Sequence, residues 1–276
     1  MLNEKHELLL AIISEMKSVV VAFSGGVDST FLLYAAIQAL GQEHVLAVTA
    51  DSESYPPEEM EEARQLARRL NVRQEIINIS ELEIAGYREN DRSRCYFCKH
   101  NLFSHLQPFT RSGEYKAIAY GLIADDVHDY RPGILAAKEL GIRSPLQEAG
   151  FTKQEIRELS RRNGLPTWDK PSFACLSSRI AYGEVITAEK LTRIWKAERY
   201  IKSLGIRQVR VRNHGNTARI EVEPEDVPVL AGKAKEVFAE LSSLGYIYVT
   251  LDLRGYQSGS MNQELEPGMD WEYDAV

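Results

Sequence analysis

The residues best suited to chemistry lie near the N-terminus, at positions 24–29, where the chain reads Ser-Gly-Gly-Val-Asp-Ser. An apolar stretch, 19–23, leads directly into the glycines, and a helical pattern begins near Ser29. Glycine lets the backbone approach a ligand closely, and the N–H groups at a helix start favour an anion. The Walker spacing GxxxxGK[ST], with its lysine, is absent. The run therefore predicts a phosphate site of another type.

Three cysteines form the second group with chemical potential: Cys95 and Cys98 in a CxxC, and Cys175 far downstream. A lone CxxC is compatible with half of a zinc site, a redox pair or two buried side chains. A Cys₄ zinc ribbon would need a second CxxC, whereas His100 or His105 could complete a Cys₃His site. Three thiolates also fit a [4Fe–4S] cluster with one iron left open. These alternatives, and a Cys175 that acts without any metal, stay open.

The elements that must position these groups alternate between short apolar strands and helices. We expect an amphipathic helix over 1–16, a helix over 57–70, and strands at 19–23, 45–51, 73–79 and 116–122. This order predicts an α/β fold, with a parallel sheet covered by helices on both faces.

Ligands of such sheets bind beyond the carboxyl ends of the strands. Ser24, Asp51, Ser52 and Gly121 fall at those ends, which indicates a nucleotide cleft. The CxxC is expected in a polar loop after residues 89–92, which argues against a thioredoxin-like pair at a helix start.

A change of composition over 164–187 marks the passage to a smaller α+β domain. The expected domains are 1–182 and 183–276. The second should contain a helix at about 187–204, strands at 209–212 and 219–223, a helix over 224–241 and a strand at 247–251. Arg210 and Arg212 lie two apart on one of these strands, so they share a face and could hold a phosphate.

Bulk properties exclude some classes of protein. The 276 residues are 44% hydrophobic and carry a net charge of −7, so a packed core is feasible and a role in gripping a long nucleic acid is disfavoured. No apolar run approaches the roughly 18 residues of a membrane span. The odd number of cysteines and the lack of an export signal predict a cytoplasmic protein.

Several segments carry a resemblance to known families. Residues 24–29 resemble the pyrophosphate (PP) loop of the N-type ATP pyrophosphatases, which include GMP synthetases, NAD synthetases and tRNA-thiolating enzymes. The segments 120–133, 165–176 and 209–221 resemble the LarE family, and the resemblance spans nearly the whole chain. It implies an ATP-dependent sulfurtransferase that uses Mg²⁺, adenylates the carboxylates of pyridinium-3,5-biscarboxylic acid mononucleotide, and replaces AMP by sulfur during nickel-pincer cofactor assembly.

The resemblance also implies roles for individual residues. Cys175, Asp28 and Lys99 are the expected catalytic residues, and Cys95, Cys98 and Cys175 the expected ligands of a [4Fe–4S] cluster. The expected ATP-binding residues are Ser24, Gly25, Gly26, Asp28, Ser29, Gly121, Asp126 and Arg131. The substrate phosphate is expected on Arg179, Arg210 and Arg212, with Lys170 as a further phosphate ligand. Glu198 and Glu221 could hold a divalent ion at a subunit junction, or could form ordinary salt bridges.

Two questions remain open at this point. Some members of the family sacrifice one cysteine, corresponding to Cys175, whereas a three-cysteine branch carries the cluster and passes on added sulfide. Cys95 and Cys98 favour the second route. A tRNA thiolase and a non-catalytic ATP- or metal-binding protein are the competing functions. We expect a homo-oligomer whose partners are a small nucleotide substrate and a sulfide or other sulfur donor, with no membrane and no nucleic acid.

Overall fold

The computed structural model describes residues 2–128, 132–257 and 259–261, and it divides the chain into two compact units. Unit 1 is Met1–Cys175 and unit 2 is Leu176–Val276. The division falls before the expected boundary at residue 182, because the short helix η3 (Leu176–Arg179) makes its contacts within unit 2. The whole of 164–187 looks irregular in the sequence, so composition alone places the boundary only coarsely.

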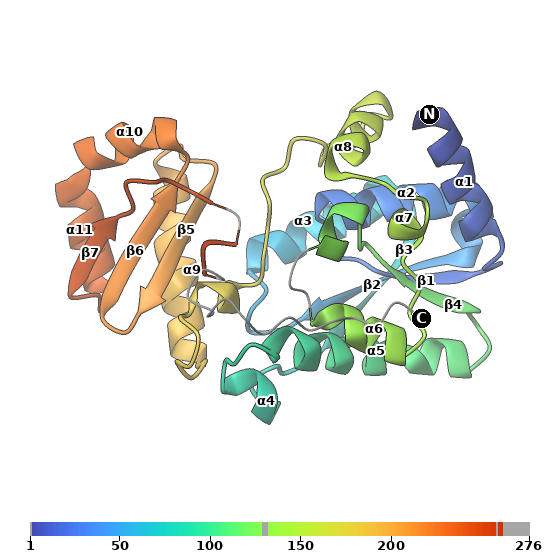
Figure 1. Ribbon diagram of the computed structural model, residues 1–276, viewed down its shortest axis with the longest axis horizontal. Helices are drawn as coiled ribbons and strands as arrows, with labels where there is room; N and C mark the ends of the chain where they lie inside the picture. Colours follow the sequence, from blue (N-terminus) through green and yellow to red (C-terminus); the bar gives the residue numbers. More distant parts are fainter. Residues whose placement is uncertain (1, 129–131, 258, 262–276) are drawn as a thin grey trace. The chain divides into compact units, whose positions relative to one another are not determined.

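Unit 1 is built around a four-stranded sheet in the order β3-β2-β1-β4 (Figure 1). All its strand pairs are parallel, and Val19 of β1 lies opposite Val45 of β2 and Ala117 of β4. The carboxyl ends of the strands therefore meet at one edge of the sheet. The strands are β1 (Val19–Ala22), β2 (Val45–Asp51), β3 (Arg73–Asn78) and β4 (Ala117–Tyr120).

Helices cover both faces of this sheet, which explains why β1 is apolar at every position. Val19 and Val21 pack into a core with one set of helices, and Val20 packs into a separate core with the other. The first set is α1 (Leu2–Ser14), α2 (Val27–Leu40), α3 (Pro57–Arg69), α7 (Pro145–Glu148) and α8 (Lys153–Arg162). The second is α5 (Arg94–Arg111) and α6 (Gly133–Glu139). The predicted α/β fold is confirmed.

The CxxC lies in the first turn of α5 and not in a loop, so that expectation is wrong. The polar residues before it form the helix start: Asp91 accepts hydrogen bonds from the backbone N–H and hydroxyl of Ser93, which precedes the helix. Asp and Ser favour helix starts as well as loops, which is why the sequence was ambiguous here. The short helix α4 (Ala85–Arg88) precedes it, and a Cβ on its Gly86 would lie 2.3 Å from the ring of Phe97 in α5.

Unit 2 is a small α+β unit with the sheet order β5-β6-β7. β5 (Val209–His214) and β6 (Thr217–Val222) are antiparallel, whereas β6 and β7 (Tyr248–Leu251) are parallel. The helices are α9 (Ala188–Ser203), α10 (Val227–Gly232) and α11 (Ala234–Ser243). The single helix expected over 224–241 is thus divided, because Gly232 ends α10 and Lys233 leaves helical geometry.

None of the described helices is both long and apolar enough to cross a membrane.

Candidate active site

The loop at residues 24–29 joins β1 to α2 in the conformation that its glycines allow. Gly25 has a φ of +65°, and a Cβ at this position would lie 3.1 Å from the Cβ of Ala63 in α3. The hydroxyls of Ser24 and Ser29 are 3.1 Å apart across the loop. No side chain caps α2, so the N–H groups of its first turn are directed at whatever occupies the loop. The loop therefore fits an anion such as pyrophosphate.

Gly121 closes this site from the end of β4. A Cβ on Gly121 would lie 3.1 Å from the backbone nitrogen of Ser29 and 3.3 Å from the Cβ of Asp28. Only a residue without a side chain lets the end of β4 approach the start of α2 so closely. The structure therefore brings Gly121 together with the loop, as the sequence predicts.

Asp28 in the first turn of α2 is held by an ion pair that the sequence does not reveal. The ammonium of Lys153 lies 2.5 Å from Oδ2 of Asp28. Lys153 is the first residue of α8, which begins with a capping box formed by Thr152 and Glu155. The other carboxylate oxygen, Oδ1, is buried and has no hydrogen-bond partner in the part of the chain that the structure describes. An unsatisfied carboxylate oxygen beside a phosphate loop fits Mg²⁺, which prefers oxygen ligands.

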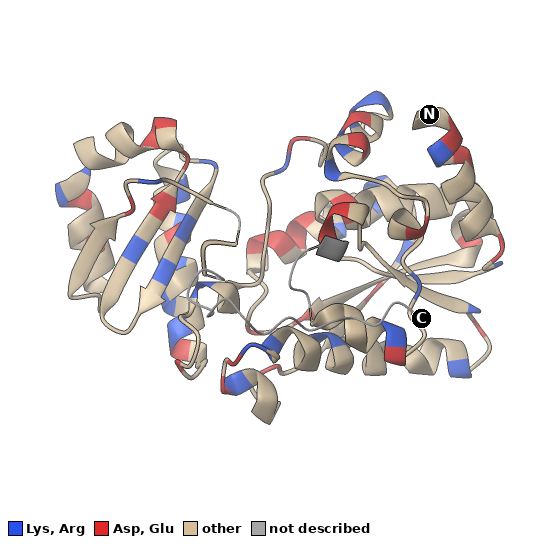
Figure 2. Ribbon diagram, viewed as in Figure 1, with Lys and Arg blue, Asp and Glu red and all other residues tan. Residues whose placement is uncertain are grey.

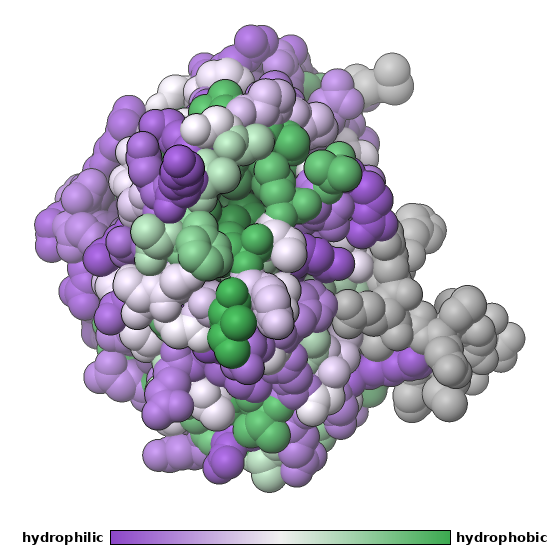
Figure 3. Space-filling model, turned by 90° about the vertical axis from the view of Figure 1, so that its left-hand side faces the viewer, coloured by the Kyte–Doolittle hydropathy of each residue, from purple (hydrophilic) through white to green (hydrophobic). Residues whose placement is uncertain are grey.

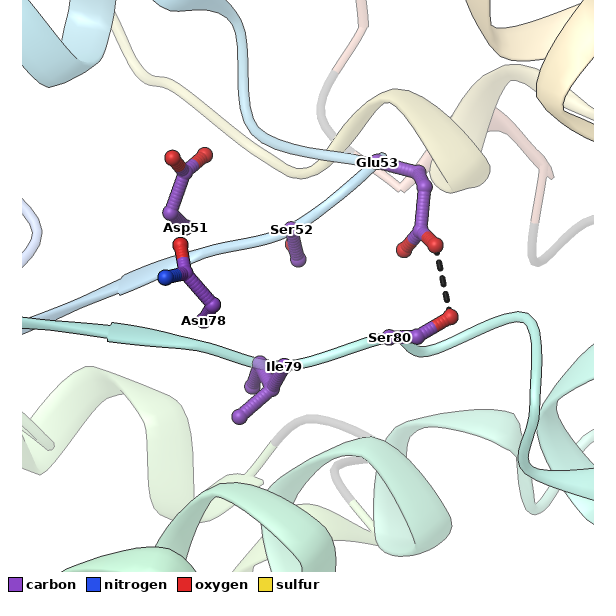
Figure 4. A pocket seen from close by; sticks show the side chains of 6 residues that line it. All are labelled: Asp51, Ser52, Glu53, Asn78, Ile79 and Ser80. Atoms are coloured by element: carbon purple, nitrogen blue, oxygen red, sulfur yellow. Dashed lines mark hydrogen bonds between the residues drawn. The ribbon is translucent and has the colours of Figure 1, made fainter.

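A cavity of about 450 Å³ opens at the carboxyl ends of β2 and β3 (Figure 4). Two of its lining residues are joined by a hydrogen bond of 2.6 Å from the hydroxyl of Ser80 to Glu53. Asp51 and Ser52, which the sequence places at a nucleotide cleft, both contribute to its wall. The lining residues are Asp51, Ser52, Glu53, Asn78, Ile79 and Ser80.

Cys98 is bound to Glu81, a buried carboxylate that sequence reasoning missed. The thiol of Cys98 donates to Oε1 of Glu81 at 2.9 Å, and Oε2 accepts from the hydroxyls of Tyr87 at 3.0 Å and Ser52 at 3.2 Å. Glu81 therefore links the cysteine helix to the wall of the cavity. No local pattern marks such a residue, because its partners lie on three different segments.

The protonation of Cys98 differs from that of a redox cysteine. Burial raises the pKa of the Cys98 thiol, Glu81 and Cys175 raise it further, and only Lys99 acts in the opposite direction. A reactive CxxC normally has a lowered pKa, so the helix start alone does not make this pair thioredoxin-like. Cys175, far from Cys98 in sequence, lies near enough in unit 1 for its charge to act on the Cys98 thiol.

Cys95 is exposed, whereas Cys98 and Cys175 are half-buried. Among the described residues, no group of three or more His, Cys, Asp or Glu side chains is gathered closely enough to hold a metal ion. The structure thus brings Cys98 and Cys175 together, but it does not gather all the cysteines around one point.

The other residues expected in unit 1 lie in varied surroundings. Lys99 packs its aliphatic chain under Gly133, and its ammonium lies 5.8 Å from the ring centre of Phe103. Asp126 is buried and accepts a hydrogen bond from the backbone N–H of Ile123 at 3.3 Å. Arg131 lies outside the described residues.

The side chain of Lys170 contacts the backbone of the phosphate loop. Its ammonium is 3.3 Å from the carbonyl oxygen of Gly25 and 2.7 Å from a carboxylate oxygen of both Glu59 and Glu62 on α3. Burial acts to lower the pKa of Lys170, but Glu59 and Glu62 outweigh it and the pKa is raised. The acidic run on α3 is visible in Figure 2.

The arginines expected to bind the substrate phosphate are all buried in unit 2, where basic and acidic residues lie side by side on β5 and β6 (Figure 2). Arg179 donates to both carboxylate oxygens of Glu198, at 2.9 and 3.1 Å. Arg212 donates to Glu221 at 2.7 Å. Glu198 and Glu221, predicted as ligands of a divalent ion, therefore have arginine partners, and their metal role stays a prediction.

Arg210 lies 5.3 Å above the ring of Tyr256. Burial, together with the nearby positive charge of Arg179, lowers the pKa of Arg210 to about 10. Burial also acts to raise the pKa of Glu198, but Arg179 and Arg210 outweigh it and the pKa is lowered. Arg179, Arg210 and Glu198 therefore form one buried group of charges in unit 2.

Comparisons with known proteins agree with this geometry. The family model described as NAD synthase matches residues 8–108, which contain the phosphate loop. An NH₃-dependent NAD⁺ synthetase of Hyperthermus butylicus is 47% identical over 75 residues, or 27% of each chain. An uncharacterised protein of Synechocystis sp. is 45% identical over 267 residues, which cover 96% of this chain and 99% of that protein.

The pyridinium-3,5-bisthiocarboxylic acid mononucleotide synthase of Lactiplantibacillus plantarum is 38% identical over 264 residues, 96% of each chain. This similarity extends through both units, whereas the NAD⁺ synthetase shares about a quarter of the chain. The resemblance noted in the sequence is thereby confirmed. The chain belongs to the family of the pyridinium-3,5-bisthiocarboxylic acid mononucleotide synthases, within the PP-loop superfamily.

Proposed function

We propose that this protein uses ATP to insert sulfur into pyridinium-3,5-biscarboxylic acid mononucleotide, giving the bisthiocarboxylic acid mononucleotide. The observation that carries this proposal is the glycine phosphate loop at the start of α2, which Gly121 closes, in the unit that also contains all three cysteines. The similarity to a synthase of this product over 96% of the chain supports it.

The first step activates a carboxylate. A substrate carboxylate oxygen attacks the α-phosphorus of ATP, the bond to the β-phosphate breaks, and pyrophosphate leaves. Gly25, Gly26 and the first turn of α2 hold the departing pyrophosphate by backbone N–H groups. Asp28 would hold Mg²⁺, which neutralises the phosphate charge. Ser24 and Ser29 shape the loop, and Gly121 and Asp126 complete its surroundings.

In the second step, sulfur replaces AMP. A sulfur nucleophile attacks the carbonyl carbon of the acyl-adenylate, the carbon–oxygen bond to the phosphate breaks, and AMP leaves. In the sacrificial route, the Cys175 thiolate attacks, and elimination across its Cα–Cβ bond then releases the thiocarboxylate and leaves dehydroalanine. In the catalytic route, added sulfide supplies the sulfur atom and Cys175 is unchanged.

We favour the catalytic route, with Cys95, Cys98 and Cys175 as ligands of a [4Fe–4S] cluster. A cluster with three protein ligands leaves one iron able to bind sulfide. Cys95 and Cys98 share one turn of α5, and Cys98 neighbours Cys175, which supports this donor set. The side chains must move closer to bind a cluster, since no such group is gathered among the described residues. Lys99 would counter the negative charge that the thiolates bring.

We further propose that Arg179, Arg210 and Arg212 hold the 5′-phosphate of the mononucleotide. Each guanidinium can donate several hydrogen bonds to phosphate oxygens. Burial is the largest cause of the lowered pKa of Arg210; Arg179 and Arg212 act in the same direction, and Glu198 acts against them.

A homo-oligomer is also expected. Large apolar side chains are exposed on the α10, α11 and β7 side of unit 2, and Figure 3 shows apolar surface on the face that it turns to the viewer. These residues are Val229, Phe238, Ile247, Tyr248 and Leu253. Light scattering of the purified protein measures the number of subunits.

The deciding experiment is an anaerobic assay with ATP, Mg²⁺, the mononucleotide and sulfide. The proposed function requires AMP, pyrophosphate and thiolated product in amounts that depend on the mononucleotide. It is wrong if the protein thiolates tRNA and not the mononucleotide, or if no AMP forms. Iron and sulfide analysis counts the cluster. Several turnovers with unchanged protein mass support the catalytic route, whereas loss of one H₂S from Cys175 per sulfur transferred supports the sacrificial route.

A further inference from the structure

Residues 168–175, which we call the Cys175 arm, are attached to the phosphate-loop side of unit 1 before they reach the cysteine. Arg157 of α8 donates to the carbonyl oxygens of Trp168 at 2.7 Å and Lys170 at 2.8 Å. Lys170 in turn reaches the carbonyl oxygen of Gly25 in the loop. These contacts fix the beginning of the arm, but they leave four residues between Lys170 and Cys175.

Tyr55 supplies a further contact to the arm, two residues before the cysteine. Its hydroxyl donates to the carbonyl oxygen of Ser24 at 2.8 Å, with the carbonyl of Glu59 at 3.1 Å as a second acceptor. Its ring meets the ring of Phe173 edge to face, with centroids 5.9 Å apart and planes at 76°. Phe173 is two residues before Cys175. A single side chain thus touches both the phosphate loop and the Cys175 arm.

We propose that Tyr55 is a positioning residue for sulfur transfer, which holds Cys175 in a fixed place relative to the phosphate loop through Ser24 and Phe173. This inference rests on the proposed function. The acyl-adenylate forms beside the loop that holds the departing pyrophosphate, and a sulfur nucleophile must come within roughly 3–3.5 Å of its acyl carbon to react. An arm that is attached to the loop keeps the sulfur close to the acyl carbon before the reaction begins.

The electrostatics around Tyr55 suit this role. Burial raises the pKa of Tyr55, and the carboxylates of Glu59, Glu62 and Asp51 raise it further. The hydroxyl therefore stays protonated and remains a hydrogen-bond donor to Ser24.

The test separates the two contacts of Tyr55. Phe173→Leu keeps an apolar side chain but removes the edge-to-face contact, and Tyr55→Phe keeps the ring but removes the hydrogen bond to the loop. Tyr34→Phe is the matched control, because it removes a hydrogen bond of 2.9 Å to Asn163 elsewhere in unit 1. Thermal unfolding and circular dichroism establish that each variant is folded.

Two quantities are measured: thiolated product per AMP released, and the rate at which iodoacetamide alkylates Cys175 relative to Cys95 in protein freed of iron and of nucleotide. Water competes with sulfur for the acyl-adenylate, so a misplaced sulfur lowers product per AMP. We expect this ratio to fall about five-fold in both Tyr55→Phe and Phe173→Leu. This is the effect expected from the loss of one hydrogen bond or one aromatic contact. Alkylation of Cys175 should rise by a similar factor only in Phe173→Leu, and Tyr34→Phe should match the wild type.

An unchanged product-to-AMP ratio in both variants would overturn the inference, as would equal alkylation of Cys175 in Phe173→Leu and wild type. Wild-type protein that forms no AMP with the mononucleotide would instead refute the proposed function. The alkylation measurement would still decide whether Phe173 holds the arm, so the two failures are distinguishable.

Discussion

The ammonium of Lys153 lies 2.5 Å from Oδ2 of Asp28, a residue 125 positions earlier in the chain. The ion pair orients the carboxylate in the first turn of α2, while Oδ1 stays buried and without a hydrogen-bond partner in the described part of the protein. A buried carboxylate oxygen that lacks a partner normally costs free energy, so its retention beside a phosphate loop points to a cation that is present when ATP binds.

Asp28→Asn should therefore abolish adenylation while the protein stays folded. The amide keeps the shape of the side chain but loses the charge that would hold Mg²⁺ and pair with Lys153. We expect release of AMP and pyrophosphate to fall by about 100-fold or more. Asp125→Asn is the control, because Asp125 is an exposed carboxylate that accepts from the backbone N–H of Lys153 and has no assigned role in binding ATP. Adenylation by Asp28→Asn at the parental rate would show that the loop assignment is wrong.

Gly25→Ala should also stop adenylation, and it should destabilise unit 1. Alanine must adopt a φ of +65° and place its Cβ 3.1 Å from the Cβ of Ala63. Gly113→Ala is the matched control, since Gly113 has a φ of +82° but nothing within 4 Å of the added Cβ. The strained φ costs about 1–2 kcal/mol in both variants, and the contact adds to it only at Gly25. If denaturant titrations give equal losses of stability for Gly25→Ala and Gly113→Ala, the close approach of Gly25 to Ala63 is contradicted.

Arg212→Ala should weaken binding of the mononucleotide by about ten-fold or more, and binding of ATP far less. Arg212 lies on β5 with Glu221 as its partner, so unit 2 will also lose stability. Calorimetry well below the melting temperature separates the two effects, and Arg212→Lys, which keeps the charge, should bind with intermediate affinity. Arg254→Ala, an exposed arginine of the same unit, serves as the control. Equal loss of both affinities would indicate a purely structural role.

The ion pair of Arg179 and Glu198 should make the stability of unit 2 depend on pH. Arg179 more than offsets the effect of burial and lowers the pKa of Glu198 below 4.5 in the folded protein. A lowered folded pKa contributes stability that is complete above the unfolded pKa and is lost as the pH falls through the folded pKa. Unfolding midpoints should therefore drop steeply below about pH 4.5.

Glu198→Gln tests this linkage. It should be about 3 kcal/mol less stable at pH 7, because Arg179 is left buried without its counter-charge, and its stability should change less below pH 4.5. Glu189→Gln, on the exposed face of the same helix, should follow the wild type. Parallel curves for Glu198→Gln and wild type between pH 5 and 3 would refute the linkage.

Local sequence was a sound guide wherever the backbone itself demands a residue type. The continuous apolar run of β1 reflects a strand buried on both faces, and Gly25 reflects a positive φ that other residues rarely adopt. The polar residues before Cys95 were the exception. They read as a loop because Asp and Ser favour loops and helix starts alike, and only the helical backbone that begins at Arg94 separates the two.

The sequence by itself determined the α/β order, the phosphate loop and the family to which the chain belongs. Tertiary structure alone decided which side chains meet: Lys153 with Asp28, Glu81 with Cys98, and Tyr55 with Phe173. It also paired the expected phosphate-binding Arg212 with the expected metal ligand Glu221. Backbone geometry leaves a local trace in the sequence, whereas a contact between distant side chains depends on sheet register and helix packing, which no short segment encodes.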